Sequence, residues 1–224
     1  GPVKMPSADA AKPPSSHLFR NHSTDSPKTS TRSDSHATIN PPTPTTTLIV
    51  GAGLAGSLLA WRLLQAGERV RLVGSRRLPG ASRAAAGVIN PVTGRWMTKS
   101  WRFETAYPEA LATYRALERR LGGTFFRPLP VRRFCLNAED AKRARRRSRN
   151  PRYADVIEAF TEAPDAALGL RDTHGSLRIR PAGWVDLPLL LDSLWRHFMD
   201  CGVAEDAAFA YGALQPAPDG WRYR

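Results

Sequence analysis

The sequence predicts an α/β fold, because a strand, a glycine-rich turn, a helix and a second strand follow one another directly. The first apolar strand covers residues 48–50, a helical run covers 57–66 and ends at Gly67, and the second strand covers 70–73. This order defines a βαβ unit, whose two strands run parallel. With 42% hydrophobic residues among 224, the chain also has enough apolar side chains for a packed core.

The turn between the first strand and the helix reads GAGLAG over residues 51–56 and matches the pattern G-x-G-x-x-G. In a βαβ unit, Gly51 permits the tight turn, Gly53 lets the backbone approach a diphosphate, and Gly56 lets helix and strand pack closely. The N-terminus of the helix adds free N–H donors and a partial positive charge, which attract an anion. The sequence therefore predicts that this turn binds the diphosphate of a dinucleotide.

The acidic residue that usually follows the second strand of such a unit is absent. In dinucleotide-binding folds, an Asp or Glu at this place accepts hydrogen bonds from a ribose. Here the place falls on Gly74, followed by Ser75 and two arginines, Arg76 and Arg77. Arginine side chains favour a phosphate on that ribose, so NADP is an alternative ligand.

The rest of the chain adds helices and short strands. Asp186 is the expected N-cap of the last helix, and Gly202 follows the end of that helix. Pro128 and Pro130 interrupt the strand-like segment at 125–135, which precedes the predicted helix at 138–148. The predicted helices are 104–121, 138–148 and 187–199, and the predicted strand segments are 125–135, 176–185, 209–214 and 221–224.

Two segments resemble a known protein family. Residues 81–91 (ASRAAAGVINP) resemble the S-x-x-A-A-G turn of the FAD-dependent amine and amino-acid oxidases, the group of D-amino-acid oxidase, glycine oxidase and sarcosine oxidase. Residues 179–186 (IRPAGWVD) resemble the turn at which the chain of these oxidases returns from the substrate domain. The phrase GVINPVTG over residues 87–94 is similar to a bacterial subgroup of FAD-dependent oxidoreductases.

The resemblance implies a Rossmann-like FAD-binding domain with an inserted antiparallel-sheet α+β substrate domain. Members of the group are longer than this chain, so we expect a C-terminally truncated fragment that binds FAD weakly on its own. The low content of large apolar residues predicts a disordered N-terminal tail. The expected domains are the Ser/Thr/Pro-rich tail at 1–46, the FAD-binding βαβ unit and flavin turn at 47–95, part of the substrate domain at 96–182, and an incomplete return to the FAD-binding domain at 183–224.

The resemblance also implies which residues contact FAD. Gly74 and Ser75 are expected beside the ribose, and the small residues 85–87 are expected to open a helix whose backbone lies against the flavin. The implied contacts with the diphosphate are Gly51, Gly53, Leu54, Ala55 and Gly56, and those on the path to the isoalloxazine are Ala81, Ser82, Ala86, Gly87 and Val88.

The reaction implied by the resemblance is oxidation of a small amine or amino acid, with hydride transfer from the carbon that bears the nitrogen to FAD. No general base is required, so no catalytic residue is assigned, and His174 and His197 are interpreted as surface or helix residues. We hypothesise that Arg95 and Lys99 face the substrate side of the flavin. The aromatic residues expected in the core of this region are Trp96, Trp101, Phe103 and Tyr107.

More than half of the net charge of +13 comes from one segment, because the run KRARRRSRNPR at residues 142–152 holds seven Lys and Arg residues and no acid. Such a run is an electrostatic footprint for nucleic acid. Because the family that the chain resembles includes the oxidase domain of a tRNA-modifying enzyme, such a domain is an alternative function. No aromatic residue interleaves the run, and its arginines fall on every face of the predicted helix, which favours a solvated surface helix. A non-catalytic dinucleotide-binding module is a further alternative.

Composition disfavours several other classes of protein. No run of about 18 or more apolar residues occurs, so no membrane span is predicted. Cys135 and Cys201 lack C-x-x-C spacing, which predicts neither a disulfide framework nor a metal site. Two reduced cysteines are typical of a cytoplasmic protein. The sequence specifies no oligomeric state.

Overall fold

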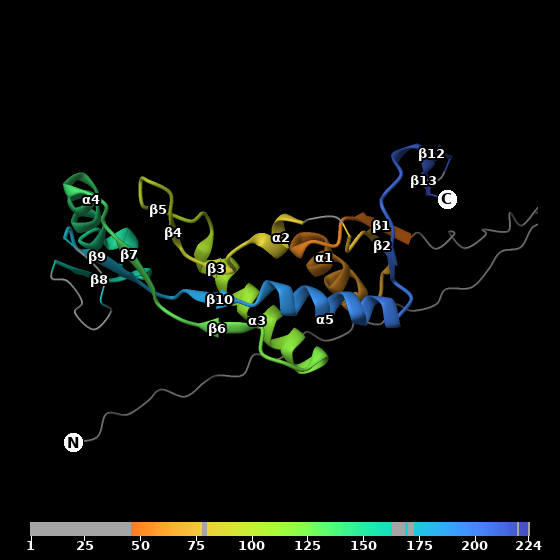
Figure 1. The fold of residues 1–224 in the computed structure, drawn as a ribbon, viewed down its shortest axis with the longest axis horizontal. Helices are drawn as coiled ribbons and strands as arrows, with labels where there is room; N and C mark the ends of the chain where they lie inside the picture. Colours follow the sequence, from red (N-terminus) through yellow and green to blue (C-terminus); the bar gives the residue numbers. More distant parts are fainter. Residues whose placement is uncertain (1–45, 78–79, 163–168, 170–172, 219, 224) are drawn as a thin grey trace, which may run out of the picture. The chain divides into compact units, whose positions relative to one another are not determined.

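The computed structural model describes residues 46–224 apart from 78–79, 163–168, 170–172, 219 and 224 (Figure 1). The tail expected at residues 1–46 lies outside the described residues, except for Thr46 at the start of the first strand. The described helices are α1 (Leu54–Gln65), α2 (Ala81–Ala84), α3 (Phe103–Leu121), α4 (Ala138–Ser148) and α5 (Leu187–Asp200), with 3-10 turns η1 (Pro151–Tyr153) and η3 (Tyr211–Ala213).

The described strands form one parallel sheet and four small antiparallel sheets. The parallel sheet has the order β1 (Thr46–Val50), β2 (Arg69–Gly74) and β11 (Ala204–Asp206). The antiparallel sheets are β3 (Val88–Ile89), β10 (Gly183–Val185) and β6 (Phe126–Pro128); β7 (Val131–Phe134), β9 (Ser176–Ile179) and β8 (Ile157–Thr161); β4 (Val92–Thr93) with β5 (Thr98–Lys99); and β12 (Leu214–Ala217) with β13 (Gly220–Tyr223). The predicted α/β class is confirmed.

The predicted βαβ unit is present at the start of the described chain. β1 and β2 pair in parallel, with Ile49 opposite Leu72, and α1 connects them. Both residues are buried together with Trp61 of α1. The helix begins at Leu54 rather than at the predicted residue 57, because Gly53 has an extended backbone and serves as the N-cap.

The C-terminal segments differ from the prediction. β11, which the sequence analysis missed, continues the parallel sheet beyond β2, with Asp206 opposite Gly74. The sequence of β11, Ala-Glu-Asp, has no apolar alternation, so periodicity does not reveal it. The strand predicted at 209–214 is wrong, because the chain there forms η3 and then enters the β12–β13 hairpin, with Phe209 stacked on Tyr223.

Helix α5 packs against α1, α3 and β11. The Asp186 carboxylate accepts a hydrogen bond from the Leu189 amide at 3.1 Å, as expected of an N-cap. The buried residues follow the helical period, so one face of the helix contributes to the core. The buried apolar residues of α5 are Leu187, Leu190, Leu191, Leu194, Trp195 and Phe198.

A second group of buried side chains lies among β4, the β7–β9–β8 sheet and α4. The strand-like segments predicted at 125–135 and 176–185 appear as β6 with β7 and as β9 with β10, and Pro128 is the last residue of β6. Helix α4 has the predicted bounds, and α3 begins one residue earlier than expected. Residues buried in this group include Val92, Met97, Val156, Leu177 and Ile179.

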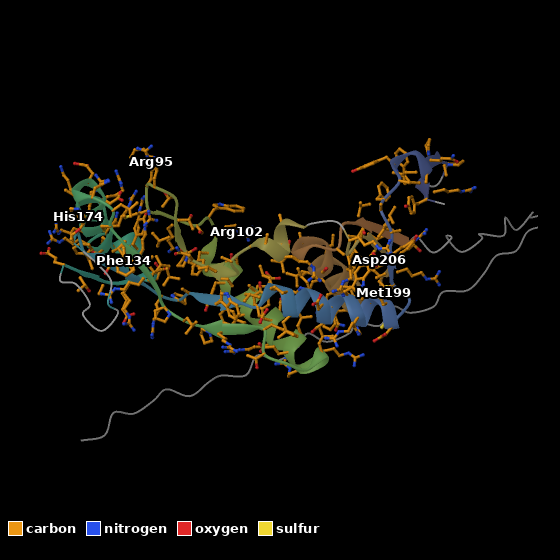
Figure 2. The ribbon with its side chains drawn as sticks, viewed as in Figure 1. Arg95, Arg102, Phe134, His174, Met199 and Asp206 are labelled. Atoms are coloured by element: carbon orange, nitrogen blue, oxygen red, sulfur yellow. The ribbon has the colours of Figure 1, made fainter. Side chains whose placement is uncertain are left out.

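The aromatic cluster expected in the core is only partly buried. Phe103 is buried, but Trp96 and Trp101 are 57% and 85% exposed. The guanidinium of Arg95 lies 4.8 Å from the centre of the Trp96 ring, and that of Arg102 lies 5.3 Å from the centre of the Trp101 ring (Figure 2). The expectation for the two tryptophans is therefore wrong, since they contact neighbouring arginines through cation–π interactions rather than packing in the core.

Truncation of Phe198 to alanine is expected to lower the free energy of unfolding by about 3–5 kcal/mol, because the ring is fully buried and its removal leaves a cavity. The neighbouring Met199 is 45% exposed, so Met199→Ala is the matched control and should change stability by less than about 0.5 kcal/mol. Urea denaturation of both variants measures the difference. Equal effects of the two substitutions would contradict the packing of α5 described above.

Candidate functional site

The turn between β1 and α1 is bonded to the end of β2. Gly51 has a φ of +102°, a backbone angle that favours glycine. Its amide donates a hydrogen bond to the Val73 carbonyl at 2.8 Å. The turn therefore lies at the edge of the parallel sheet where β1 and β2 end, which is the ligand-binding edge of open α/β sheets.

Two further glycines let the backbone segments at this edge approach each other. A Cβ atom on Gly56 would collide with the Gly51 carbonyl oxygen, so α1 can pack on the turn only without a side chain there. A Cβ atom on Gly74 would lie 2.8 Å from the Ala52 amide nitrogen, which is closer than Cβ atoms come to such a group. An acidic residue at position 74 would therefore push the turn away. This steric conflict explains why β2 ends in glycine rather than in an Asp or Glu.

A carboxylate from another strand lies beside the end of β2. Asp206, the last residue of β11 (Figure 2), is opposite Gly74, and its Oδ1 accepts a hydrogen bond from the Arg76 amide at 3.1 Å. The next strand of the sheet thus carries a carboxylate at the level of Gly74. Sequence analysis missed Asp206 because it did not predict β11.

The short helix α2 contacts the start of α1 through a serine. The Ser82 hydroxyl accepts a hydrogen bond from the Leu54 amide at 3.0 Å, so it satisfies one of the free donors of the α1 N-terminus. A Cβ atom on Gly53 would lie 3.1 Å from the Ser82 hydroxyl oxygen. The absence of a side chain at Gly53 therefore gives α2 room to lie against the turn.

The expectation that residues 85–87 open a helix is wrong. Helix α2 ends before them at Ala84, and Gly87 has a φ of +71°, which ends the helical path. The Gly87 carbonyl accepts a hydrogen bond from the Val185 amide at 2.8 Å, and the Ala86 carbonyl accepts one from the Trp184 indole at 2.9 Å. Contacts with β10 therefore take this segment into β3 instead.

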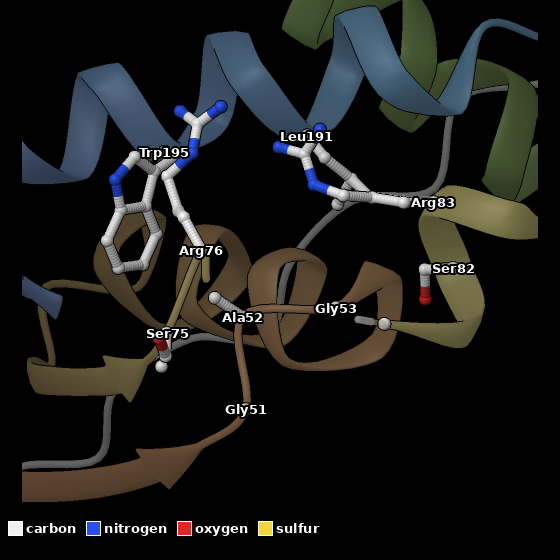
Figure 3. A pocket seen from close by; sticks show the side chains of 11 residues that line it. Gly51, Ala52, Gly53, Ser75, Arg76, Ser82, Arg83, Leu191 and Trp195 are labelled. Atoms are coloured by element: carbon white, nitrogen blue, oxygen red, sulfur yellow. The ribbon is translucent and has the colours of Figure 1, made fainter. Parts of the chain in front are cut away.

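A cavity of about 230 Å³ lies over the glycine turn (Figure 3). It is bounded by the turn, by the ends of β2 and α2, and by one face of α5. Its lining residues are Gly51, Ala52, Gly53, Gly74, Ser75, Arg76, Gly80, Ser82, Arg83, Leu191 and Trp195. The cavity thus combines backbone, two hydroxyls and two guanidinium groups.

The structure brings together some of the proposed contact residues and not others. Those that line the cavity are Gly51, Gly53, Gly74, Ser75 and Ser82. The others lie in the body of an element or at the β3–β10 contact: Leu54, Ala55 and Gly56 in α1, Ala81 in α2, and Ala86, Gly87 and Val88 beside β10. Sequence analysis missed Leu191 and Trp195, because residues of α5 reach this turn only through the fold, and it assigned no contact to Arg83 of α2.

The two arginines of the cavity share one carboxylate on α5. Asp192 Oδ1 accepts a hydrogen bond from Arg76 at 2.6 Å and another from Arg83 (Figure 3 shows both arginine side chains directed toward α5). Burial alone would raise the pKa of Asp192. The hydrogen bond from Arg83 and the positive charges of Arg83, Arg76 and Arg196 outweigh burial and hold this pKa below its ordinary value.

The other residues considered for chemistry have structural contacts. The pKa of His197 is lowered by burial and by the charge of Arg120, so the imidazole, which lies beside Trp61, is neutral near pH 7. The Lys99 ammonium pairs with Asp155 at 2.6 Å and also with Glu104. Within the described residues, no group of three or more His, Cys, Asp or Glu side chains is placed to hold a metal ion, and no helix is long and apolar enough to cross a membrane.

The parallel sheet, the glycine turn at its edge and the cavity over the start of α1 define a dinucleotide-binding α/β protein. A model of the family described as FAD dependent oxidoreductase matches residues 46–205, which contain the glycine turn, the cavity lining and all of the parallel sheet except its last residue, Asp206. The chain therefore belongs to the family of FAD-dependent oxidoreductases, and FAD is the cofactor of that family. Among the curated proteins, none matches the chain.

Two of the solved structures that resemble the fold are oxidases. Glycine oxidase from Geobacillus kaustophilus has a TM-score of 0.60 and 19% identity, covering 78% of this chain and 49% of that one. Iminodiacetate oxidase from Chelativorans sp. BNC1 has a TM-score of 0.54 and 22% identity, with the same two coverages of 78% and 49%. At these identities the likeness shows the fold, and the chain spans about half the length of the two structures.

The residues of the cavity fit the diphosphate part of FAD. Gly51 and Gly53 present backbone without side chains, the start of α1 carries amide donors, and Arg76 and Arg83 add positive charge. The NADP alternative rested on Arg76 and Arg77 after β2, and Arg76 is paired with Asp192. The family match favours FAD over NADP.

The Asp192 carboxyl is expected to titrate below its ordinary value of 3.8. Because the folded-state pKa is lowered, the stabilisation from its ion pairs is present above pH 3.8 and is lost as the pH falls through the lower folded-state pKa. At 37% exposure of its side chain, the contribution to stability is less than about 1 kcal/mol. An NMR titration of the Asp192 carboxyl carbon tests the direction, and Arg83→Gln should move the midpoint upward. A midpoint that is the same in both proteins would contradict the assigned cause.

Proposed function

We propose that this chain forms the FAD-binding part of an oxidoreductase that oxidises the C–N bond of a small amine or amino acid by hydride transfer to FAD. The observation that carries the proposal is the cavity over the glycine turn, inside a segment that matches the FAD-dependent family. The names of the two similar structures, glycine oxidase and iminodiacetate oxidase, support a substrate with a nitrogen-bearing carbon. Family membership also favours an enzyme over a non-catalytic dinucleotide-binding module.

Each part of the cavity has a role in this proposal. The backbone of Gly51 and Gly53 lets the diphosphate approach the start of α1, where amide donors offset its charge. Gly74 and Ser75 lie at the end of β2, where the ribose is expected, and Asp206 is close enough to this end to bond the Arg76 amide. FAD, when bound, supplies the acceptor for the hydride.

The remaining proposed contacts form the path from the diphosphate toward the isoalloxazine. Ser82 lies beside the turn, and the segment from Ala86 to Val88 follows it along β10. In this proposal residues 47–95 and 183–224 contribute to the FAD-binding domain, and residues 96–182 contribute to the substrate domain. The antiparallel β7–β9–β8 sheet lies within residues 96–182, which supports the assignment of this range to a substrate domain. A cytoplasmic location is proposed with it, supported by two free cysteines.

The test of the reaction uses the protein isolated from its native source, loaded with FAD and mixed without oxygen with a panel of amines and amino acids. Substrates should bleach the visible absorbance of the flavin, because the hydride reduces it. The corresponding carbonyl product and ammonia or amine should appear in equal amount. Bleaching by NADPH but by no amine or amino acid would contradict the proposed substrate class.

The 224-residue chain alone is expected to bind FAD weakly, so that little flavin co-purifies with it. A fluorescence titration with FAD measures the remaining affinity. Gly53→Val should weaken it about tenfold or more, since the added side chain fills the approach to the turn beside Ser82, and tenfold is about 1.4 kcal/mol. Gly212→Ala is the control, because a Cβ there meets no atom within 4 Å. Full flavin occupancy in the purified chain would contradict weak binding.

A second candidate function, binding of RNA by the oxidoreductase, is favoured by the way the charges of α4 divide. Three arginines of this helix lie over aromatic rings: Arg143 over Trp96, Arg145 over Phe160 and Arg147 over Tyr153, all near 5 Å. Three other cations are exposed and form no ion pair with a described residue: Lys142 and Arg146 of α4, and Arg149, the C-cap that follows this helix. Their spacing of four and three residues places them along one face of the helix. The outward charges therefore form one stripe that suits successive phosphates.

The RNA candidate predicts a strong dependence of binding on salt. If the stripe contacts three phosphates, replacing Lys142, Arg146 and Arg149 by glutamine should reduce the slope of log K against log salt by about 2 for single-stranded RNA. The matched control replaces three exposed arginines of α3 by glutamine, namely Arg115, Arg119 and Arg120. Filter binding of tRNA at several salt concentrations measures both slopes. Equal slopes for the two triple variants would remove the RNA candidate.

A further inference from the structure

We infer that Asp192 is a built-in competitor of the cofactor, whose carboxylate occupies the two arginines that would otherwise contact the diphosphate of FAD. The inference deepens the proposed function and rests on it, because it concerns the same cavity. It assigns a specificity role to a residue of α5 that belongs to neither the glycine turn nor the two segments on which the family resemblance depends.

The geometry places one carboxylate oxygen between two cations of the cavity lining. Arg76 follows β2 and Arg83 lies in α2, and the guanidinium groups of both bond Asp192 Oδ1. Both arginines line the cavity over the glycine turn, and their side chains extend from opposite sides toward α5 (Figure 3). The same two donors are therefore available either to Asp192 or to an anion in the cavity.

Backbone contacts hold the two arginine segments in place without Asp192. The Arg76 amide donates to Asp206, and the Arg83 amide donates to the Gly80 carbonyl at 3.0 Å. Their guanidinium groups can consequently exchange partners while the main chain stays in position. An anion that enters the cavity needs only side-chain rotations to replace the Asp192 carboxylate.

The charges of Arg76, Arg83 and Asp192 decide whether removal of the carboxylate strengthens or weakens anion binding. Arg76, Arg83 and Asp192 together carry one positive charge, and they would carry two if the carboxylate were neutral. The carboxylate is bonded to two arginines of the cavity lining, and its charge repels a diphosphate bound beside them. Its value in orienting the arginines is small, because the three side chains are 37–38% exposed and pairs of this kind contribute little. Removing the charge frees both guanidinium groups and also removes the repulsion, so it should strengthen anion binding.

The experiment measures the affinity of the chain for ADP by isothermal titration calorimetry, since ADP carries the adenosine and diphosphate of FAD without the flavin. Asp192→Asn is expected to lower the Kd for ADP by about three- to tenfold and to make it more sensitive to salt. The matched control is Glu109→Gln, which removes a carboxylate paired with Arg62 at the same 2.6 Å outside the cavity. This control should change the Kd by less than about twofold.

Two more sets of variants make the result decisive. Arg76→Gln and Arg83→Gln should each weaken ADP binding, and the gain in affinity from Asp192→Asn should be smaller when both arginines are replaced, because no guanidinium group is then left to be freed. Asp192→Ser serves as a second neutral variant, with circular dichroism as the check of folding. An unchanged or weaker affinity in a folded neutral variant overturns the inference.

The design separates this inference from the proposed function. In one outcome, wild type binds ADP and Gly53→Val weakens this binding, while the neutral variants at position 192 bind ADP no more tightly than wild type. This result would support the cofactor cavity and contradict the proposed role of Asp192. If folded wild type binds ADP but Gly53→Val, Arg76→Gln and Arg83→Gln all bind it equally well, ADP does not bind in this cavity and both proposals fall.

Discussion

The close approach of three backbone segments at the edge of the parallel sheet is the constraint on which the cavity depends. Helix α1 rests on the carbonyl of Gly51 where Gly56 has no side chain, and the end of β2 rests on Ala52 where Gly74 has none. A glycine inside a helix costs about 0.5–1 kcal/mol relative to alanine. The chain accepts this cost at Gly56 because any Cβ there would separate helix and turn. The start of α1 is thereby kept within reach of an anion at the sheet edge.

A second close approach joins the two segments that carry the family resemblance. Residues 81–91 and 179–186 are far apart in sequence, yet β3 and β10 pair, and the Gly87 carbonyl bonds the Val185 amide. A Cβ atom on Gly87 would collide with the Val185 carbonyl oxygen. The pairing sets α2 on one side of the cavity and α5, which begins just after β10, on another. The two sequence patterns are therefore halves of one structural unit.

Local patterns were sufficient to predict the elements that have strong periodicity, and insufficient where a contact over long distance decides the structure. α3, α4 and α5 were predicted nearly to the residue, because apolar spacing, the Asp186 cap and glycine ends are local signals. The Ala–Gly segment gave the wrong element, because its hydrogen bonds to β10 take it into β3. The pairs of Asp192 with Arg76 and Arg83 span 116 and 109 residues, so no local pattern could indicate them.

The basic run shows how far a count of charges can depart from the charge available to a ligand. The run contains no aromatic residue, but the fold places three rings against it, those of Trp96, Phe160 and the adjacent Tyr153, and half-buried arginines of α4 cover them. Arg143 and Arg145 are also paired with Asp140 and Glu162. These arginines stabilise the packing of α4 against its neighbours, as long side chains with apolar stems do. What remains for a polyanion is the outward stripe, so its affinity for RNA should follow those few cations rather than the formal charge of the segment.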